Sequence, residues 1–160
     1  MGGNNMARGY IFEIVDDENK GLLKTMDESD FYDMSGREFG YVEDVPEDER
    51  ISLIHGLLDR LIDTYGFIAG EDNSGTPLLI ASHKAKQNYF AEALKEVKKI
   101  VTSMSIELFS SNVDVLQYLI EDTDGDAVFY NGCFYRSFDY FVRKMVPNQK
   151  YYIGNVVLMH

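Results

Sequence analysis

The chain has 160 residues, 45% of them hydrophobic, with 10 Phe and 11 Tyr. This composition argues against disorder and predicts a single domain over residues 1–160 with an apolar core. A net charge of −12 argues against direct binding to nucleic acid or to an anionic membrane. One Cys leaves no internal disulfide, and no apolar run approaches the about 18 residues of a membrane span, so a soluble cytoplasmic protein is expected.

The charge is concentrated in the first half of the chain. Residues 1–76 contain 18 Asp and Glu against 6 Lys and Arg, a net charge of −12, whereas residues 77–160 contain 9 of each kind. Residues 16–49, called the acidic segment below, carry 13 acids and 3 bases. Charge of one sign raises the local potential and attracts basic surfaces. The acidic segment is therefore the first place to look for function.

The chain begins with small and polar residues. Residues 1–5 precede a second Met and are interpreted as an added extension that carries no argument about the fold. Residues 9–15 are β-branched and aromatic and predict a strand. Residues 16–44 show no clean period, which indicates either a long loop with short ordered pieces or a flexible acidic flap.

The clearest helix is predicted over residues 46–65. Its apolar side chains recur at spacings of three and four, acids occupy its first turn, and Gly66 follows its end. Residues 67–69 and 78–81 then read as two short strands joined by a polar hairpin loop.

A second long helix is predicted over residues 83–104, with Ser82 as its N-cap. Its expected core-facing residues are apolar at helical spacing: Phe90, Ala93, Leu94, Val97, Val101 and Met104. Residues 106–109 are predicted to form a strand, which makes residues 78–109 a candidate right-handed βαβ unit.

Shorter elements are predicted for the rest of the chain. Residues 112–120 indicate a short helix, and Asn131-Gly132 indicates a type I′ hairpin between strands 127–130 and 133–136. A helix from Ser137 to Met145 and a final strand over residues 151–159 complete the pattern. Because hairpins interrupt the alternation of helix and strand, the predicted fold is α+β: one mixed β-sheet with two long amphipathic helices and shorter helices packed on it.

No sequence motif points to a cofactor, a metal or a catalytic residue. Asp122, Asp124 and Asp126 resemble the start of a calcium loop, but Ala127 and Cys133 stand where the loop needs Gly and Glu. Cys133 lies among aromatic residues and is interpreted as a buried apolar side chain rather than a nucleophile. No cofactor is therefore predicted, and an enzyme is not the favoured interpretation.

The favoured hypothesis is a non-enzymatic binding or inhibitory module whose acidic segment engages a basic protein. Its expected partner-binding residues combine acids with aromatic anchors: Asp27, Glu28, Asp30, Phe31, Tyr32 and Asp33. Two alternatives stay open for this segment. It can be a solvated face that keeps the protein soluble, and its aromatics can pin it to the domain.

A rival hypothesis is a small enzyme or ligand-binding domain with a pocket between the sheet and the helices. The sequence predicts no oligomeric state, and metal binding at the aspartates of residues 122–126 remains a third possibility.

Overall fold

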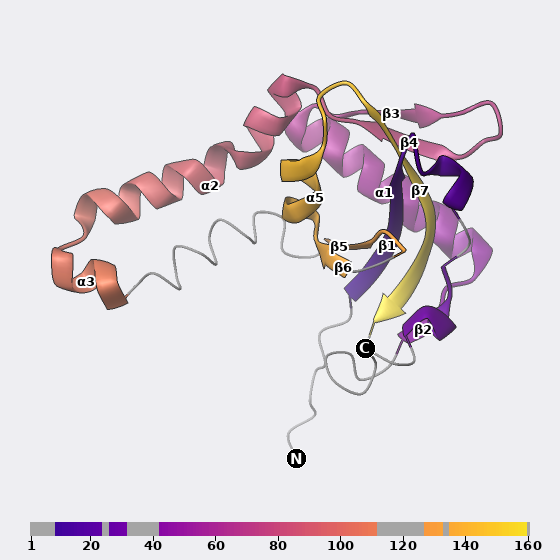
Figure 1. Cartoon of the computed structure of the whole chain (residues 1–160), viewed down its shortest axis with the longest axis horizontal. Coiled ribbons are helices and arrows are strands. Elements are labelled where there is room, and N and C mark those ends of the chain that lie inside the picture. The colour runs from indigo at the N-terminus through magenta and orange to yellow at the C-terminus, as the bar shows by residue number, and fades with distance from the viewer. Residues whose placement is uncertain (1–8, 24–25, 32–41, 112–126, 133–134, 160) are drawn as a thin grey trace, which may run out of the picture.

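The fold is built on one mixed β-sheet, shown in Figure 1. The computed structural model describes residues 9–23, 26–31, 42–111, 127–132 and 135–159. Within these ranges, seven strands pair in the order β3-β4-β7-β1-β5-β6, and β2 pairs with β7. The strands are β1 (Gly9–Asp16), β2 (Val42–Asp44), β3 (Ile68–Glu71), β4 (Pro77–Ile80), β5 (Ala127–Tyr130), β6 (Tyr135–Ser137) and β7 (Lys150–Met159). Only the β1–β5 pair among these is parallel, so the predicted α+β class with a mixed sheet is confirmed.

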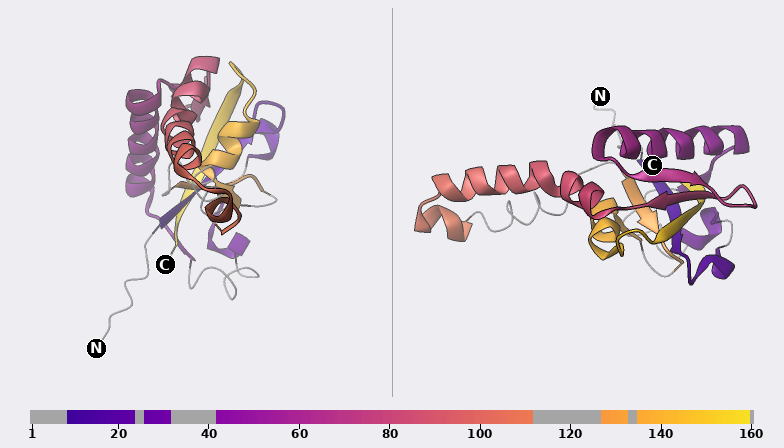
Figure 2. Two further views of the ribbon diagram at one scale, coloured as in Figure 1. Left: turned by 90° about the vertical axis from the view of Figure 1, so that its left-hand side faces the viewer. Right: turned by 90° about the horizontal axis from the view of Figure 1, so that it is seen from above.

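The described helices are α1 (Glu47–Tyr65), α2 (His83–Ser103), α3 (Ile106–Ser111) and α5 (Phe138–Lys144). Helix α1 covers one face of this sheet (Figure 2), and α5 and the start of α2 pack against the same apolar core. The main apolar core lies between α1, the start of α2, α5 and the sheet. Its members from the strands are Phe12, Ile14, Leu79, Ile153 and Val156. Burial of this core is the chief favourable contribution to folding.

The predicted helix over residues 46–65 is α1. Four of its apolar side chains, Ile54, Leu57, Leu58 and Leu61, are buried against the sheet. Gly66 ends the helix with φ of 77°, a left-handed conformation that suits glycine. The hairpin that follows, β3 with β4, also lies where the sequence predicts it.

The opposite face of the sheet is covered by part of the acidic segment. Two 3₁₀ turns, η1 (Lys20–Leu22) and η2 (Glu28–Phe31), lie on this side. Met26 and Phe31 are fully buried and pack in a cluster with Ile11, Val42 and Val157. The described part of residues 16–44 is therefore a loop with short ordered pieces. One of these pieces, β2, is a strand that the sequence does not predict.

Helix α2 begins as predicted, but most of it projects away from the sheet, as Figure 2 shows. The Ser82 hydroxyl caps its start by accepting a hydrogen bond from the Ala85 amide at 3.0 Å. Of its side chains only Ala85 and Tyr89 are buried, whereas Leu94 and Val101 are 53% and 48% exposed. The predicted core-facing stripe is therefore wrong beyond the first two turns. Periodicity reveals an apolar face of a helix but not what covers that face.

The strand predicted over residues 106–109 is also wrong. These residues form helix α3 at the outer end of α2, visible in Figure 2. Ser105 caps it, since its carbonyl accepts from the Phe109 amide at 2.9 Å and its hydroxyl accepts from the Leu108 amide at 3.3 Å. A short apolar run fits a helix as well as a strand. The proposed βαβ unit is therefore absent.

The hairpin β5–β6 forms, but its turn is longer than predicted. Tyr130 pairs with Tyr135, so four residues connect the strands instead of the two of a type I′ turn. Gly132 still has a positive φ of 88°. The predicted helix α5 and the final strand β7 both form. The helix predicted over residues 112–120 lies outside the described residues.

Candidate functional site

Two of the predicted partner-binding acids, Asp27 and Asp30, accept hydrogen bonds within the turn to which they belong. Asp27 accepts hydrogen bonds from the amide of Ser29, at 2.8 Å, and from its hydroxyl. The Asp30 carboxylate accepts from the Asp27 amide at 3.1 Å. Short acidic side chains commonly close turns in this way. Asp27 and Asp30 therefore have a local structural role, whatever else they bind.

The other predicted residues are placed unevenly. Phe31 is fully buried, so it pins the segment to the sheet and is not on the exposed surface. The backbone of Glu28 lies in η2. Tyr32 and Asp33 lie outside the described residues. Docking by these six residues as a group therefore stays a prediction, with Phe31 removed from the surface that a partner could contact.

A second group of acids in the same segment lies on the surface. We call it the acidic patch, and its five members, all exposed, are Glu43, Asp44, Glu47, Asp48 and Glu49. The first two belong to the edge strand β2 and the other three to the first turn of α1. Acids at a helix N-terminus are stabilised by the helix dipole, which accounts for part of this charge.

The base that follows the acidic patch in the chain is turned toward the sheet. Arg50 donates to the Gly154 carbonyl at 3.2 Å and to Glu47 Oε1 at 3.4 Å. The Arg50 guanidinium is therefore held by β7 and by one acid of the patch. It neutralises Glu47 in part.

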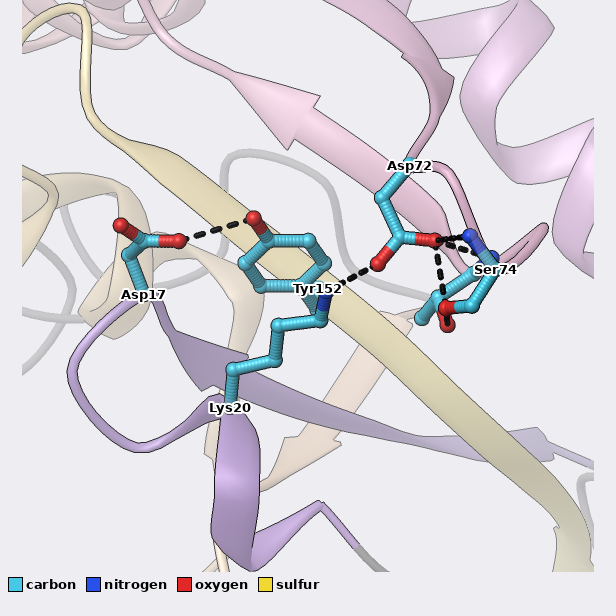
Figure 3. Close-up of polar contacts among 6 residues, drawn as sticks. Asp17, Lys20, Asp72, Ser74 and Tyr152 are labelled. Atoms are coloured by element: carbon cyan, nitrogen blue, oxygen red, sulfur yellow. Dashed lines mark hydrogen bonds and ion pairs between the residues drawn. The ribbon is translucent and has the colours of Figure 1, made fainter.

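A polar cluster, shown in Figure 3, joins three distant parts of the chain. Lys20 in η1 forms an ion pair with Asp72 in the β3–β4 loop, and its Nζ lies 4.7 Å from the centroid of the Tyr152 ring. The Tyr152 hydroxyl donates to Asp17 Oδ1 at 2.8 Å. Asp72 also accepts from Ser74 and from the Thr76 amide. The cluster fastens η1 to the sheet.

These contacts shift the pKa values of three groups. The hydrogen bond from Lys20, aided by those from Ser74 and Thr76, lowers the pKa of Asp72 far below its usual range. The same bond raises the pKa of Lys20. The hydrogen bond to Asp17 raises the pKa of Tyr152, because it stabilises the neutral phenol. All three shifts favour the charge states that hold the cluster together at neutral pH.

A buried carboxylate lies beside a bulge in β7. Glu13 is 3% exposed, and its Oε2 accepts from the Met26 amide at 3.2 Å. The β1–β7 register shifts opposite Glu13, where Gly154 leaves room for the carboxylate. Asn155 donates from its side chain to the Met26 carbonyl. Met26 is thus bonded at both its amide and its carbonyl.

A cavity of about 660 Å³ lies where β1 continues past its last pair with β5, Glu13 with Tyr130. Beyond that pair, the end of β1 and η1 form part of its wall, and α5 and the β5–β6 turn form the rest. Its apolar lining includes Ile14, Leu22, Phe141 and Met145. Its polar lining includes Asp16, Asn19, Asn131, Tyr140, Lys144 and Tyr151. This cavity is a candidate for the pocket that the rival hypothesis expects, although of the described helices only α5 and η1 line it.

Helix α5, which lines this cavity, is held to the core by a buried hydrogen bond. The Tyr89 hydroxyl donates to Asp139 Oδ1 at 2.5 Å, and both residues are almost completely buried. The Tyr89 ring packs against Tyr65 and Phe138 at centroid distances of 4.8 and 5.6 Å. The Lys86 ammonium donates to the Met145 carbonyl at 2.7 Å. The position of α5 is therefore fixed from both ends.

The structure adds little support for a metal site or for catalysis by His or Cys. In the part of the chain that the structure describes, no three His, Cys, Asp or Glu residues gather as metal ligands. Asp122, Asp124, Asp126 and Cys133 lie outside that part. His55 Nε2 is 4.0 Å from Glu71 Oε1 on the surface. The candidate sites among the described residues are therefore the acidic patch and the cavity.

Most of these features are invisible to sequence reasoning. Lys20 and Asp72 are 52 residues apart, and no local pattern joins them. The one available signal is the Asp-Asn-Ser-Gly run at Asp72, which is typical of a turn closed by an aspartate. The exposure of Glu47, Asp48 and Glu49 could be foreseen from their position at a helix start.

Comparison with known proteins finds no matching family model, no matching curated protein and no matching solved structure. Among the described helices, none is long and apolar enough to cross a membrane.

Proposed function

We propose that the protein is a non-enzymatic binding module that uses the acidic patch to engage a basic surface of another protein. The observation that carries the proposal is that five acids of the acidic segment are exposed together on β2 and the start of α1. The single Cys is in keeping with an interaction in a reducing compartment such as the cytoplasm.

The acidic patch has a firm support. Val42 is buried beneath it, and β2 pairs with the end of β7. Arg50 connects the first turn of α1 to the Gly154 carbonyl. Because these contacts fix the backbone, little ordering of the chain opposes binding. A rigid acidic surface accelerates encounter with a basic partner and limits the set of partners.

The proposal moves the docking surface within the acidic segment. The sequence favours residues 27–33, but Asp27 and Asp30 close a turn and Phe31 lies in the core. The acids of the acidic patch are instead exposed on a strand and a helix start. The turn η2 contacts β2 and would form part of the rim of the interface.

The test uses two variants of equal net charge. The patch variant carries Glu43→Gln, Asp44→Asn, Asp48→Asn and Glu49→Gln. The control variant neutralises four exposed acids elsewhere: Asp59→Asn, Asp63→Asn, Glu71→Gln and Glu92→Gln. Each raises the net charge from −12 to −8. Circular dichroism checks that both fold.

Wild type and control, immobilised and exposed to extract of the native cells, should retain a basic protein that the patch variant fails to retain. Quantitative mass spectrometry of the bound fractions measures this difference. Equal loss on both variants would show that bulk charge acts alone. Retention by all three proteins would also contradict the proposal.

A further inference from the structure

We propose that the 660 Å³ cavity binds a small zwitterionic ligand with an apolar side chain, an α-amino acid or a short peptide. This inference does not depend on the acidic patch, because no residue of the patch lines the cavity. The volume lies within the range of about 300–1,000 Å³ that is typical of small-molecule sites.

Charges of opposite sign reach the cavity from two different elements. Asp16 ends β1, and Lys144 lies in the last turn of α5. Asp16 Oδ1 accepts from the amide and the side chain of Asn19, at 2.9 and 2.6 Å, so the carboxylate is held in place. A carboxylate suits a ligand ammonium, and a lysine suits a ligand carboxylate.

Glu13 adds a second carboxylate to the lining, but it already accepts from the Met26 amide, and most of the remaining lining is apolar. Helix α5 and its C-cap contribute Tyr140, Phe141, Lys144 and Met145, which recur at the spacing of a single helix face. Ile14 and Leu22 line the cavity from β1 and η1. An aliphatic or aromatic side chain of the ligand would remove this apolar surface from water. A ligand with two opposite charges and one apolar group fits this distribution of side chains.

Both walls are held in place without a ligand. Lys20, through its pair with Asp72, fixes η1 to the β3–β4 loop. On the other side, Asp139 and the Met145 carbonyl tie α5 to Tyr89 and Lys86 of α2. A preformed cavity binds without a large cost of ordering.

The test compares phenylalanine with two analogues that each lack one charge. Phenethylamine lacks the carboxylate, and 3-phenylpropanoate lacks the ammonium. Isothermal titration should show that each loss weakens binding to the wild type by about 10- to 100-fold. Leucine and the dipeptide Leu-Phe distinguish a free amino acid from a peptide as the preferred ligand.

Variants then assign each charge to its residue. In Lys144→Gln, phenylalanine and phenethylamine should bind equally, while 3-phenylpropanoate remains weaker than phenylalanine. In Asp16→Asn the pattern should reverse. Lys150→Gln, an exposed cation outside the cavity lining, is the matched control and should behave as wild type.

Amide chemical shifts of the wild type give a second measurement that does not depend on the folding of any variant. Titration with phenylalanine should move the signals of residues 14–16 and 140–145. If no binding is detected at about 10 mM phenylalanine, the dissociation constant is weaker than millimolar and the proposal is overturned. Equal affinity for all three compounds, or shifts confined to another surface, would also overturn it.

Discussion

The Met26 amide donates to Glu13 Oε2 at 3.2 Å, and this bond fastens the acidic segment to the sheet. The contact joins a strand residue to a loop residue 13 positions later. Phe31, a few residues further on, enters the apolar cluster on the same face. The described parts of the segment are therefore attached to the domain on this face and, at Val42–Asp44, paired with the sheet as β2.

The close packing of Glu13 against Gly154 predicts that a side chain at position 154 destabilises the fold. A Cβ at this position would overlap the Glu13 carboxylate, so the carboxylate or β7 must shift. We expect Gly154→Ala to lower the free energy of unfolding by about 1–3 kcal/mol, as overpacking usually does. Chemical denaturation measures the change.

Gly56→Ala is the matched control. Gly56 lies in the middle of α1, and a Cβ added there would meet nothing within 4 Å, so Ala should stabilise the helix by about 0.5–1 kcal/mol. Equal effects of the two substitutions would contradict the close packing of Glu13 against Gly154.

The lowered pKa of Asp72 predicts a specific acid sensitivity. Because the folded-state pKa lies below that of the unfolded chain, the ionised carboxylate stabilises the fold above about pH 4. This stabilisation is lost as the pH falls below that value. Asp72→Asn should therefore lower the melting temperature at pH 7. The difference in melting temperature between variant and wild type should become smaller as the pH falls toward 2. A difference that is constant with pH would count against the ion pair with Lys20.

The raised pKa values of Lys20 and Tyr152 predict a loss of stability at alkaline pH. Their protonated forms stabilise the fold below about pH 10, and this contribution is lost as the pH rises through the raised values. Tyr152→Phe, which cannot donate to Asp17, should weaken the alkaline loss of stability in melting curves between about pH 9 and pH 12. An unchanged alkaline limb would contradict the role of this hydroxyl.

The projecting half of α2 predicts an uneven response to substitution. Leu94→Ser removes a side chain that is 53% exposed and should change the free energy of unfolding by no more than about 0.5 kcal/mol. Leu61→Ala removes a fully buried side chain and should cost about 2–5 kcal/mol. A large loss for Leu94→Ser would show that something covers this face of the helix.

The hydrogen bond between Tyr89 and Asp139 predicts that removing the Tyr89 hydroxyl lowers the free energy of unfolding without changing the packing of the ring. Tyr89→Phe keeps the ring contacts but removes a buried donor to a carboxylate, which should cost about 1–3 kcal/mol. Since α5 lines the cavity, its amide signals should shift most. An unchanged free energy of unfolding in Tyr89→Phe would show that the hydroxyl does not help to hold α5.

Strong local signals account for the parts of the fold that the sequence predicts. The apolar spacing of α1 and its terminal Gly66 define that helix, and the Ser82 cap defines the start of α2. Where the signal is only an apolar pattern, the prediction fails. Residues 106–109 suit a strand or a helix, and the stripe around Leu94 does not reveal that the sheet ends before it.

The candidate sites depend on contacts between distant residues, which explains why the sequence does not reveal them. The acids of the segment are visible, but the closing of a turn by Asp27 and the burial of Phe31 require the folded chain. The cavity is formed where β5 stops pairing with β1, and that point depends on the register of the two strands. Composition identifies the region that bears the charge, and tertiary packing selects the acids that remain exposed.

The rate of association with the captured basic protein, measured against salt concentration, is the sharpest test of docking by the acidic patch. For wild type and for the control variant the rate should fall at least about tenfold between about 50 and 500 mM salt, because screening weakens the attraction of the acidic patch. The patch variant should associate slowly at low salt and change little. Docking by the acidic patch is contradicted if the patch variant keeps the rate and the salt dependence of the wild type.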